Sequence, residues 1–424
     1  MTRNDTIAAI ATAPGRAGVA VVRVSGPDAF AVGAHVAGRP LAPGLRFVRT
    51  PYDECLVLGF RNPKSYTGED VVEFQCHGGD VTPRRILEAC FAAGARLARR
   101  GEFTERAFLN GKLDCVQAES VLDLINAKTS RAADAALAGL SGRSRDDYRA
   151  LYESSLALST RLEHALDISE EELPEGFFAD VRAQFTSLVS RLSSSLSRAH
   201  EGKLLRQGAL VVLAGPPNAG KSSLLNALLG ENRAIVSEVP GTTRDSIEAW
   251  IDLEGYPVRI VDTAGLRATG DAIEAEGVRR SEALIAQADV VVDFSSRDRN
   301  VASPLGKENT IFIHSKCDLS RGEGLNVSAK TGEGLEALKR RIVEVLRTNA
   351  RPSEGECAPS ERALSVLLEA QTHLSSVNLE GPEIDLVLAA NALRQVAELL
   401  GTLIGATYSA DLMERLFSRF CVGK

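Results

Sequence analysis

The sequence predicts a multidomain chain of the α/β and α classes: a small α+β domain, then a helical bundle into which a compact α/β unit is inserted. The chain has 424 residues, too many for one hydrophobic core. Proline and short β-branched runs gather before residue 84, and residues 84–173 contain no proline. Short apolar runs alternate with helical stretches between about residues 208 and 346, which indicates βαβ units and a parallel sheet.

Composition restricts the class of protein. Hydrophobic residues make up 44% of the chain and charged residues 25%, as in ordinary globular proteins. The net charge of −7 provides no global basic field for nucleic acid, so such a partner would need a local patch. Seven scattered cysteines without a CxxC pair argue against a zinc site or a disulfide framework and favour a reducing cytoplasm. No apolar stretch of about 18 residues is apparent, so we expect no membrane span.

The predicted segments follow in chain order. Residues 1–114 carry the strand-like runs "GVAVVRVSG", "ECLVLGF" and "DVVEFQC", which predict the α+β domain. Leucines recur at helical spacing in residues 115–205, and residues 349–424 are helical again after a polar linker. Because these helices lie on both sides of the α/β unit at 206–348, we expect them to pack together as one discontinuous bundle.

The stretch "GPPNAGKSS" at 215–223 fits the phosphate-binding loop G-x-x-x-x-G-K-[ST] between a strand and a helix. Gly215 and Gly220 allow the backbone amides to point inward, and the helix N-terminus adds positive charge. Lys221 can reach the terminal phosphates, and the Ser222 hydroxyl is placed for Mg²⁺. We therefore predict a Ras-like P-loop G domain.

Three downstream motifs select guanine as the base. Asp262 in "DTAG" ends a strand and can contact Mg²⁺ through water, and Gly265 can approach the γ-phosphate. Asp318 in "SKCD" can accept both N–H donors of the guanine edge, which adenine does not offer. "SAK", residues 328–330, follows the last strand and can cover the guanine carbonyl. The order and spacing of these motifs match the translation-factor-like GTPases. Those proteins usually have asparagine where Ser315 stands, and this shorter side chain is expected to lose a tether to the P-loop.

A further motif, "GTTRD" at 241–245, resembles a switch in which Thr243 closes over Mg²⁺. The residue after "DTAG" is Leu266, whereas a Ras-type GTPase uses glutamine there to orient water. Hydrolysis therefore requires another group to orient the attacking water.

Taken together, "DTIAAIATAPGRAGVAVVRVSG", "SYTGEDVVEFQCHGG", "RRGEFTERAFLNGKLD", the G-domain motifs and "FCVGK" resemble the tRNA modification GTPase MnmE (TrmE) family over nearly the whole chain. The resemblance implies a cytoplasmic, non-membrane homodimer that works with the flavoprotein MnmG as a heterotetramer. It implies GTP hydrolysis with Mg²⁺ and K⁺, and addition of an aminomethyl or carboxymethylaminomethyl group to C5 of the wobble uridine of certain tRNAs. The one-carbon unit would come from 5-formyltetrahydrofolate.

The resemblance also implies site residues. K⁺ would be held by Asn218, Ser237, Val239 and Thr242, and Glu274 would orient water, although a bare glutamate is by default a solvated helix charge. The predicted GTP-binding residues are Asn218, Ala219, Gly220, Lys221, Ser222, Ser223, Ser237, Glu238, Val239, Pro240, Gly241, Thr242, Thr243, Asp262, Thr263, Ala264, Gly265, Ser315, Lys316, Asp318, Ser328, Ala329 and Lys330.

The N-terminal domain is implied to be a folate-binding and dimerisation domain. Arg23, Glu73 and Lys112 would bind the folate, although each is equally a candidate for a surface salt bridge. Phe417 and Phe420 are expected to pin the C-terminal tail to this domain. Cys421 would then face the folate as a nucleophile or a positioning contact, and Lys424 would close over the ligand.

Several alternatives remain open from the sequence. A regulatory or ribosome-assembly GTPase would carry an added basic and aromatic RNA-binding module, and none is seen. A folate enzyme with a passenger G domain would not need an intact switch region. Cys76 and His77 are too few ligands for a metal site. The basic stretch Arg84–Arg106 is either a tRNA phosphate contact or a solvated helix face.

Overall fold

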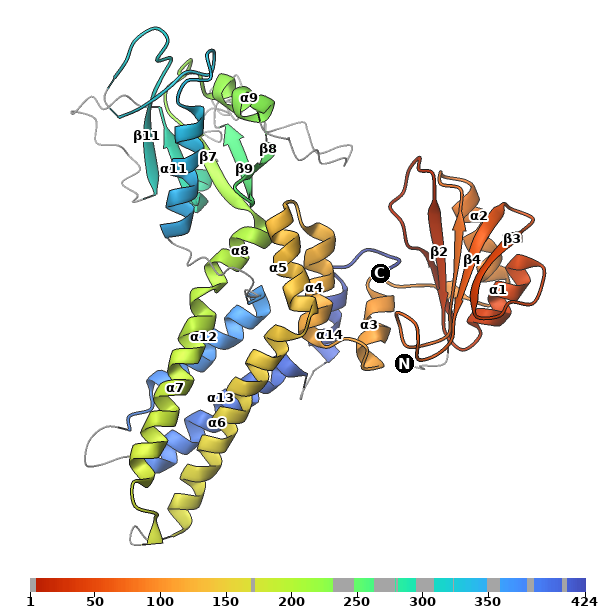
Figure 1. Cartoon of the computed structure of the whole chain (residues 1–424), viewed down its shortest axis with the longest axis horizontal. Helices are drawn as coiled ribbons and strands as arrows, with labels where there is room; N and C mark the ends of the chain where they lie inside the picture. Colours follow the sequence, from red (N-terminus) through yellow and green to blue (C-terminus); the bar gives the residue numbers. More distant parts are fainter. Residues whose placement is uncertain are drawn as a thin grey trace. The chain divides into compact units, whose positions relative to one another are not determined.

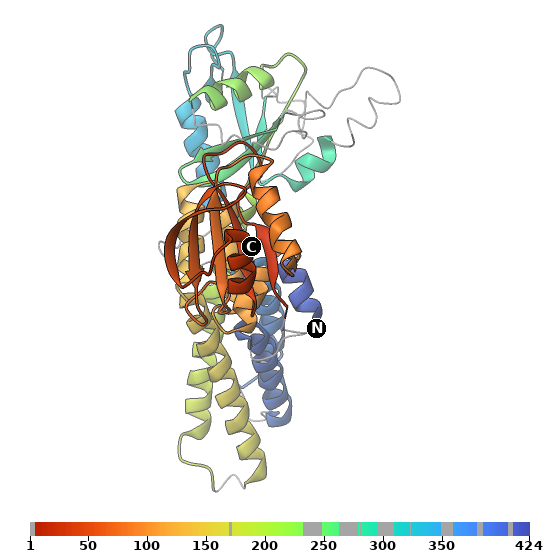
Figure 2. The same cartoon turned by 90° about the vertical axis from the view of Figure 1, so that its right-hand side faces the viewer.

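The computed structural model of the chain describes residues 5–168, 172–231, 248–262, 279, 281–294, 309–322, 324–348, 359–379, 385–405 and 410–424. The chain forms two compact units, one of Met1–Leu122 with Gly401–Lys424, the other of Asp123–Leu400 (Figures 1 and 2). The limits given above for the four segments remain predictions.

The first unit is built on a six-stranded sheet in the order β3-β4-β5-β2-β1-β6. All described neighbours in it are antiparallel except β1 and β6. Helices α1 and α2 cover one face, where Val22, Val24, Val72 and Phe74 are buried against them. The three runs predicted as strands are β2, β4 and β5, so these predictions are confirmed. The elements are β1 Ile7–Ile10, β2 Ala20–Ser25, α1 Ala29–Ala37, β3 Gly44–Arg49, β4 Glu54–Phe60, β5 Val71–Cys76, α2 Thr82–Ala92 and β6 Arg96–Leu97.

The opposite face of this sheet is covered at one end and open at the other. Residues paired across strands lie on the same face, and one such row runs through Ala9, Arg23, Glu73, Leu58 and Leu45. At the β1 end, Ala9 is buried with side chains that include Phe103 of helix α3, Glu102–Leu109. At the β3 end Leu45 remains 60% exposed. The next row is open as well, because its β3 residue Phe47 is 83% exposed.

A buried ion network fixes α3 to the sheet. The Glu102 carboxylate, 2% exposed, accepts two hydrogen bonds from the Arg96 guanidinium at 2.8 and 2.5 Å, and a third from the Arg99 backbone N–H at 2.8 Å. Arg106 pairs with Asp5, Glu69 and Glu102. The arginines at 96, 99 and 106 of the basic stretch are therefore bound to carboxylates of their own domain, which disfavours its prediction as a phosphate contact.

This network predicts a pH-dependent stability. Burial alone would raise the pKa of Glu102, but the hydrogen bonds from Arg96 and from the Arg99 backbone outweigh it and lower the pKa from 4.5 to about 2. Glu102→Gln is therefore expected to destabilise the first unit by about 3 kcal/mol at pH 7. The difference from wild type should shrink as pH falls from 4.5 toward 2, where the carboxylate itself becomes protonated. Calorimetry at pH 7 and pH 3 measures this. Glu88→Gln, which removes an exposed pair with Arg84, is the control. A difference that does not change with pH would contradict the ionised network.

The C-terminal tail docks onto this same unit, as predicted. After α14, Ala410–Phe417, the buried rings of Phe417 and Phe420 pack with Ala118, and Phe108 lies against this cluster. The backbone N–H groups of Gly101 and Phe103 donate to the carbonyls of Cys421 and Lys424, each at 3.3 Å. Gly423, at φ 100°, has no room for a side chain, because a Cβ would lie 2.3 Å from the Ile10 carbonyl oxygen.

The second unit joins helices from both sides of the α/β segment. The Ser159 hydroxyl of α6 donates to the Ala390 carbonyl of α13 at 3.1 Å, and α6 and α7 run side by side (Figure 1). The helices are α5 Ser130–Leu140, α6 Arg143–Asp167, α7 Phe177–Ser197, α8 Ala199–Gln207 and α12 Glu361–Ser375. Two more, α4 Cys115–Asn126 and α13 Leu386–Ile404, span the boundaries between the units.

One observation corrects the sequence analysis. By length and composition, α13 is apolar enough to cross a membrane, so the expectation that no such stretch exists was wrong. Its residues Leu393, Val396, Leu400 and Leu403 share a buried face, and half of its apolar window is buried by the rest of the chain. This burial is typical of a core helix.

The α/β segment has the predicted parallel sheet with one addition. Its strand order is β12-β11-β10-β7-β9-β8, and all described neighbours are parallel except β8 with β9. Both faces are covered, because along β7 Val211 and Leu213 enter one cluster and Leu210 and Val212 the other. The elements are β7 Ala209–Ala214, α9 Lys221–Glu231, β8 Glu248–Leu253, β9 Tyr256–Asp262, β10 Val290–Asp293, β11 Thr310–Ser315, β12 Leu325–Val327 and α11 Leu335–Thr348.

Candidate nucleotide site

The phosphate-binding loop lies between β7 and α9, as the sequence predicts. Gly215 has φ 139°, and a Cβ there would lie 2.8 Å from the Cβ of Phe294, so only glycine fits. Gly220 also has positive φ, at 97°. The Lys221 ammonium turns back over the loop and donates to the carbonyls of Gly215 and Pro216 at 2.9 and 2.8 Å. These groups lie at the N-terminus of α9, where partial positive charge favours an anion.

Two oxygen groups that suit a divalent ion meet beside this loop. The Ser222 hydroxyl donates to the Asp262 carboxylate at 2.5 Å, and Asp262 is fully buried at the end of β9. Mg²⁺ prefers hard oxygen ligands and keeps several waters, so a hydroxyl that can bind it and a carboxylate that can hold one of its waters fit the expected metal.

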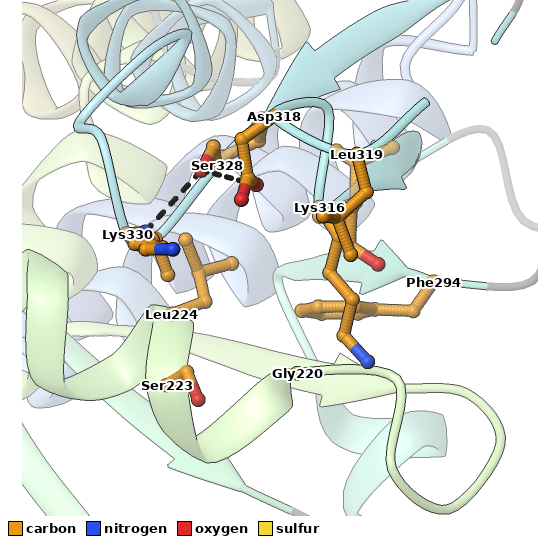
Figure 3. A pocket seen from close by; sticks show the side chains of 13 residues that line it. Gly220, Ser223, Leu224, Phe294, Lys316, Asp318, Leu319, Ser328 and Lys330 are labelled. Carbon is orange, nitrogen blue, oxygen red and sulfur yellow. Dashed lines mark hydrogen bonds between the residues drawn. The ribbon is translucent and has the colours of Figure 1, made fainter. Parts of the chain in front are cut away.

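The base-reading motifs border a cavity of about 280 Å³. Asp318 accepts a hydrogen bond from the Ser328 hydroxyl at 2.7 Å, which orients its carboxylate. The backbone N–H groups of Lys330 and Thr331 donate to the same Ser328 oxygen at 3.3 Å. Figure 3 shows Asp318 facing Ser328 at the rim of the cavity. The cavity is lined by Gly220, Ser223, Leu224, Phe294, Ile313, Ser315, Lys316, Asp318, Leu319, Val327, Ser328, Ala329 and Lys330.

The expectation that Ser315 loses its tether to the P-loop was wrong. The Ser315 hydroxyl donates to the Ala219 carbonyl at 2.8 Å, because β11 ends close enough to the loop for a short side chain to reach it. The Lys316 ammonium adds a second tether, to the Asn218 carbonyl at 2.9 Å. Asn218 and Lys316 both have φ near +60°, a conformation that these two bonds help to hold.

Sequence reasoning missed the apolar part of the pocket. The Phe294 ring lies beside the Lys316 side chain, which runs toward Gly220 (Figure 3). Leu224 and Leu319 add further apolar surface. Phe294 directly follows β10 on the edge where β7 and β11 also end, and this position after a strand was the signal that could have identified it.

Several predicted residues lie outside the described part of the chain, and their roles stay predictions. These are Ser237, Glu238, Val239, Pro240, Gly241, Thr242, Thr243, Thr263, Ala264, Gly265 and Glu274.

A second group of predicted residues meets in the first unit. The Arg23 Nε donates to Glu73 at 2.7 Å, so the two form the salt bridge considered above, but a largely buried one. The Arg23 guanidinium lies 5.2 Å from the ring centroid of Tyr66 and 5.5 Å from that of Phe103. Its Nη1 is buried without a hydrogen-bond partner. Burial and the charge of Arg23 lower the pKa of Lys424, while Glu73 acts in the opposite direction. Lys424 is joined to this pair through Phe103, whose backbone N–H donates to the Lys424 carbonyl and whose ring lies by the Arg23 guanidinium.

The other two predicted residues of this unit, Lys112 and Cys421, make different contacts from those of Arg23 and Glu73. The Lys112 ammonium donates to the Pro63 carbonyl at 3.2 Å, on the turn before β5, and the structure does not bring it to Arg23. Cys421 is exposed. Its backbone carbonyl, but not its thiol, makes the docking bond to Gly101.

Comparison with known proteins matches the chain to two family models. One, described as "GTP-binding protein TrmE N-terminus", matches residues 6–112, and the other, "MnmE helical domain", matches residues 115–421. The solved G domain of the T. maritima FeoB iron transporter is 27% identical over 32% of this chain and 98% of its own. Its TM-score is only 0.24, so the fold described here rests on the sheet topology alone.

Curated relatives match over their full length. The tRNA modification GTPase MnmE of Symbiobacterium thermophilum is 42% identical, covering 99% of this chain and 100% of the relative. The protein of that name from Xanthomonas campestris pv. campestris strain B100 is also 42% identical, with 99% of both chains covered. The one from Nitrosospira multiformis is 40% identical, with 100% of both covered. With two family models spanning almost all of its residues and full-length identity of this degree, the chain belongs to the tRNA modification GTPase MnmE family.

Proposed function

We propose that this protein is a cytoplasmic GTP hydrolase that acts in modifying the wobble uridine of certain tRNAs. With a flavoprotein partner of the MnmG kind, it would add an aminomethyl or carboxymethylaminomethyl group to C5, using a folate one-carbon unit. The observation that carries the proposal is the assembled nucleotide site, in which the phosphate loop, the Ser222–Asp262 pair and Asp318 converge in a chain of this family.

Mass spectrometry of wobble nucleosides from a deletion strain tests the proposal. The modified uridines should disappear, and they should return when this chain is supplied. A deletion strain with unchanged modified uridines would reject the function.

The nucleotide site would hold Mg²⁺ through Ser222 and Thr243, and K⁺ through Asn218 and the loop of Ser237, Val239 and Thr242. Bound cations of this kind offset the charge that develops on the phosphates. Lys221 and the amides at the start of α9 bind and orient the same phosphates. Glu274 would orient the attacking water, since Leu266 has no polar group to do so.

Hydrolysis is therefore expected to depend on potassium. GTP turnover in potassium should exceed turnover in sodium at equal ionic strength by at least about tenfold, because smaller Na⁺ fits a K⁺ ligand set poorly. Glu274→Ala should slow turnover and leave nucleotide binding intact. Equal turnover in the two salts would reject the cation mechanism, and wild-type turnover in the variant would exclude Glu274.

The first unit would bind the folate at the group of Arg23, Glu73 and Lys424. The Arg23 Nη1 is a buried donor without a partner, which an acceptor of the ligand would satisfy, and Glu73 can accept from a pterin N–H edge. The rings of Tyr66 and Phe103 offer flat surfaces beside the guanidinium. Lys112 would join this site only from a different position of its side chain or through a second copy of the chain.

A homodimer formed through the same sheet face would bring a second copy of the chain to this site. Strands β3 and β4 present Leu45 and Leu58 in the row of Arg23 and Glu73, and Phe47 and Leu56 in the next row. An apolar surface adjoining a polar site is typical of a subunit interface. We therefore propose that a second copy covers this face.

Phe47→Asp tests the interface. Placing a carboxylate on this surface should raise the dimer dissociation constant at least about 30-fold, while the fold is retained because the ring is exposed. Analytical ultracentrifugation measures the association. Leu97→Asp, on the opposite edge of the sheet, is the matched control, since Leu97 is also exposed, at 54%. A dimer of unchanged affinity would place the interface elsewhere.

Contacts at the β8–β9 hairpin could carry nucleotide-dependent movement into the helices. The Thr129 hydroxyl at the start of α5 donates to the Gly255 carbonyl at the hairpin turn, at 2.7 Å. Next to it, the Arg131 guanidinium pairs with Glu201 and lies 4.5 Å from the Tyr256 ring centroid. Strand β9 ends at Asp262, which supports a rigid link between the metal site and the inserted-domain junction.

A further inference from the structure

The hydroxyl of Ser315 has one proton, and the structure assigns it to the P-loop. It is donated to the Ala219 carbonyl at 2.8 Å. A serine hydroxyl has no second donor, whereas an asparagine amide has two N–H groups. An asparagine at this position could hold the loop with one N–H and offer the other to a ligand. Ser315 can do only the first.

The position of Ser315 identifies the ligand atom concerned. Ser315 lies at the end of β11 and lines the base cavity between Ala219 of the P-loop and Asp318. A guanine that presents its N1 and N2 donors to Asp318, with its phosphates in the P-loop, turns the opposite edge of its ring toward the loop. That edge carries N7, which is an acceptor and can only be read by a donor.

We propose that this pocket recognises guanine without a hydrogen bond from residue 315 to N7, so that residue 315 adds nothing to the selectivity for the base. The neighbouring ammonium of Lys316 is likewise anchored on the loop, because it donates to the Asn218 carbonyl at 2.9 Å. The chain should therefore accept purines altered at position 7. The inference rests on the proposed function, since it concerns the same GTP site.

Calorimetric titration with GDP and 7-deaza-GDP tests the proposal, because the analogue replaces N7 by C–H and keeps the edge read by Asp318. The wild-type chain is expected to bind the two ligands with affinities within about twofold of each other. Ser315→Asn should introduce a preference for GDP of about three- to tenfold, the usual effect of one hydrogen bond. Ser315→Ala, which removes the tether, should weaken both ligands equally.

A wild-type preference of fivefold or more for GDP over the analogue overturns the inference while leaving GTP binding as the function. Failure to bind either guanine nucleotide overturns both. The wild-type measurement decides the question by itself if Ser315→Asn does not fold.

Discussion

Replacing Asp318 by asparagine is expected to lower the affinity for GTP at least about 100-fold and to raise the affinity for xanthosine triphosphate. In the proposed site the carboxylate would accept from two donors of guanine, and an amide in its place would present a donor to one of them. A site built to accept hydrogen bonds from its ligand discriminates strongly when the match is lost. Xanthine carries a carbonyl where guanine has its amino group, so the amide restores the pairing.

The surroundings of Asp318 sharpen this expectation. The Ser328 hydroxyl, 2.7 Å from the carboxylate, can bond to the amide oxygen equally well and hold the new side chain in place. Competition titrations with the two nucleotides measure the switch. Asp180→Asn, at an exposed carboxylate of α7, is the matched control and should bind GTP as wild type does. Unchanged GTP affinity in Asp318→Asn would show that the base is read by other residues.

Replacing Cys421 by serine is expected to abolish tRNA modification in cells while GTP hydrolysis and association of the chain remain. The Cys421 side chain is exposed, and its segment docks on the unit to which we assign the folate through the backbone and the two buried phenylalanines. Serine has nearly the same shape, so the tail should stay docked. What changes is the nucleophile, because a thiol is far more easily ionised than a hydroxyl.

Wobble nucleosides from a deletion strain carrying the variant give the measurement. Ser418→Ala, an exposed residue of the same tail, should restore the modified uridines fully. If Cys421→Ser also restores the modified uridines, the thiol has no chemical role and the tail only covers the site.

Much of this fold could be predicted, because local patterns determine it. The runs that became β2, β4, β5 and β7 are apolar and β-branched, and the P-loop has fixed glycines. Strand β8 was missed since it is an antiparallel edge strand that a βαβ pattern does not require. Its signal was the hairpin turn at Glu254–Gly255, where both residues have positive φ, at 49° and 86°.

The candidate site was less predictable where distant residues decide it. Arg23 was identified by its motif, but Tyr66 and Phe103 reach it only through the tertiary fold. The basic stretch contains no sign that Asp5 and Glu69 neutralise Arg106, because those partners come from other parts of the chain. The prediction for Ser315 considered only the length of its side chain. Whether this side chain bonds to the P-loop depends on the distance between β11 and the loop, which the sequence does not give.

The docked tail has a consequence for the order of events during synthesis. The two parts of the first unit are separated by 278 residues, 123–400. At about 5–20 residues per second, the ribosome needs roughly 15 to 55 s to make them. During that interval the emerging sheet and α3 lack Phe417 and Phe420, and their docking surface is bare. The nascent chain therefore exposes apolar groups until the tail with Phe417 and Phe420 has been made, and a chaperone that binds such groups would meet it in this window. Fragments that end before residue 401 should carry the same exposed surface permanently.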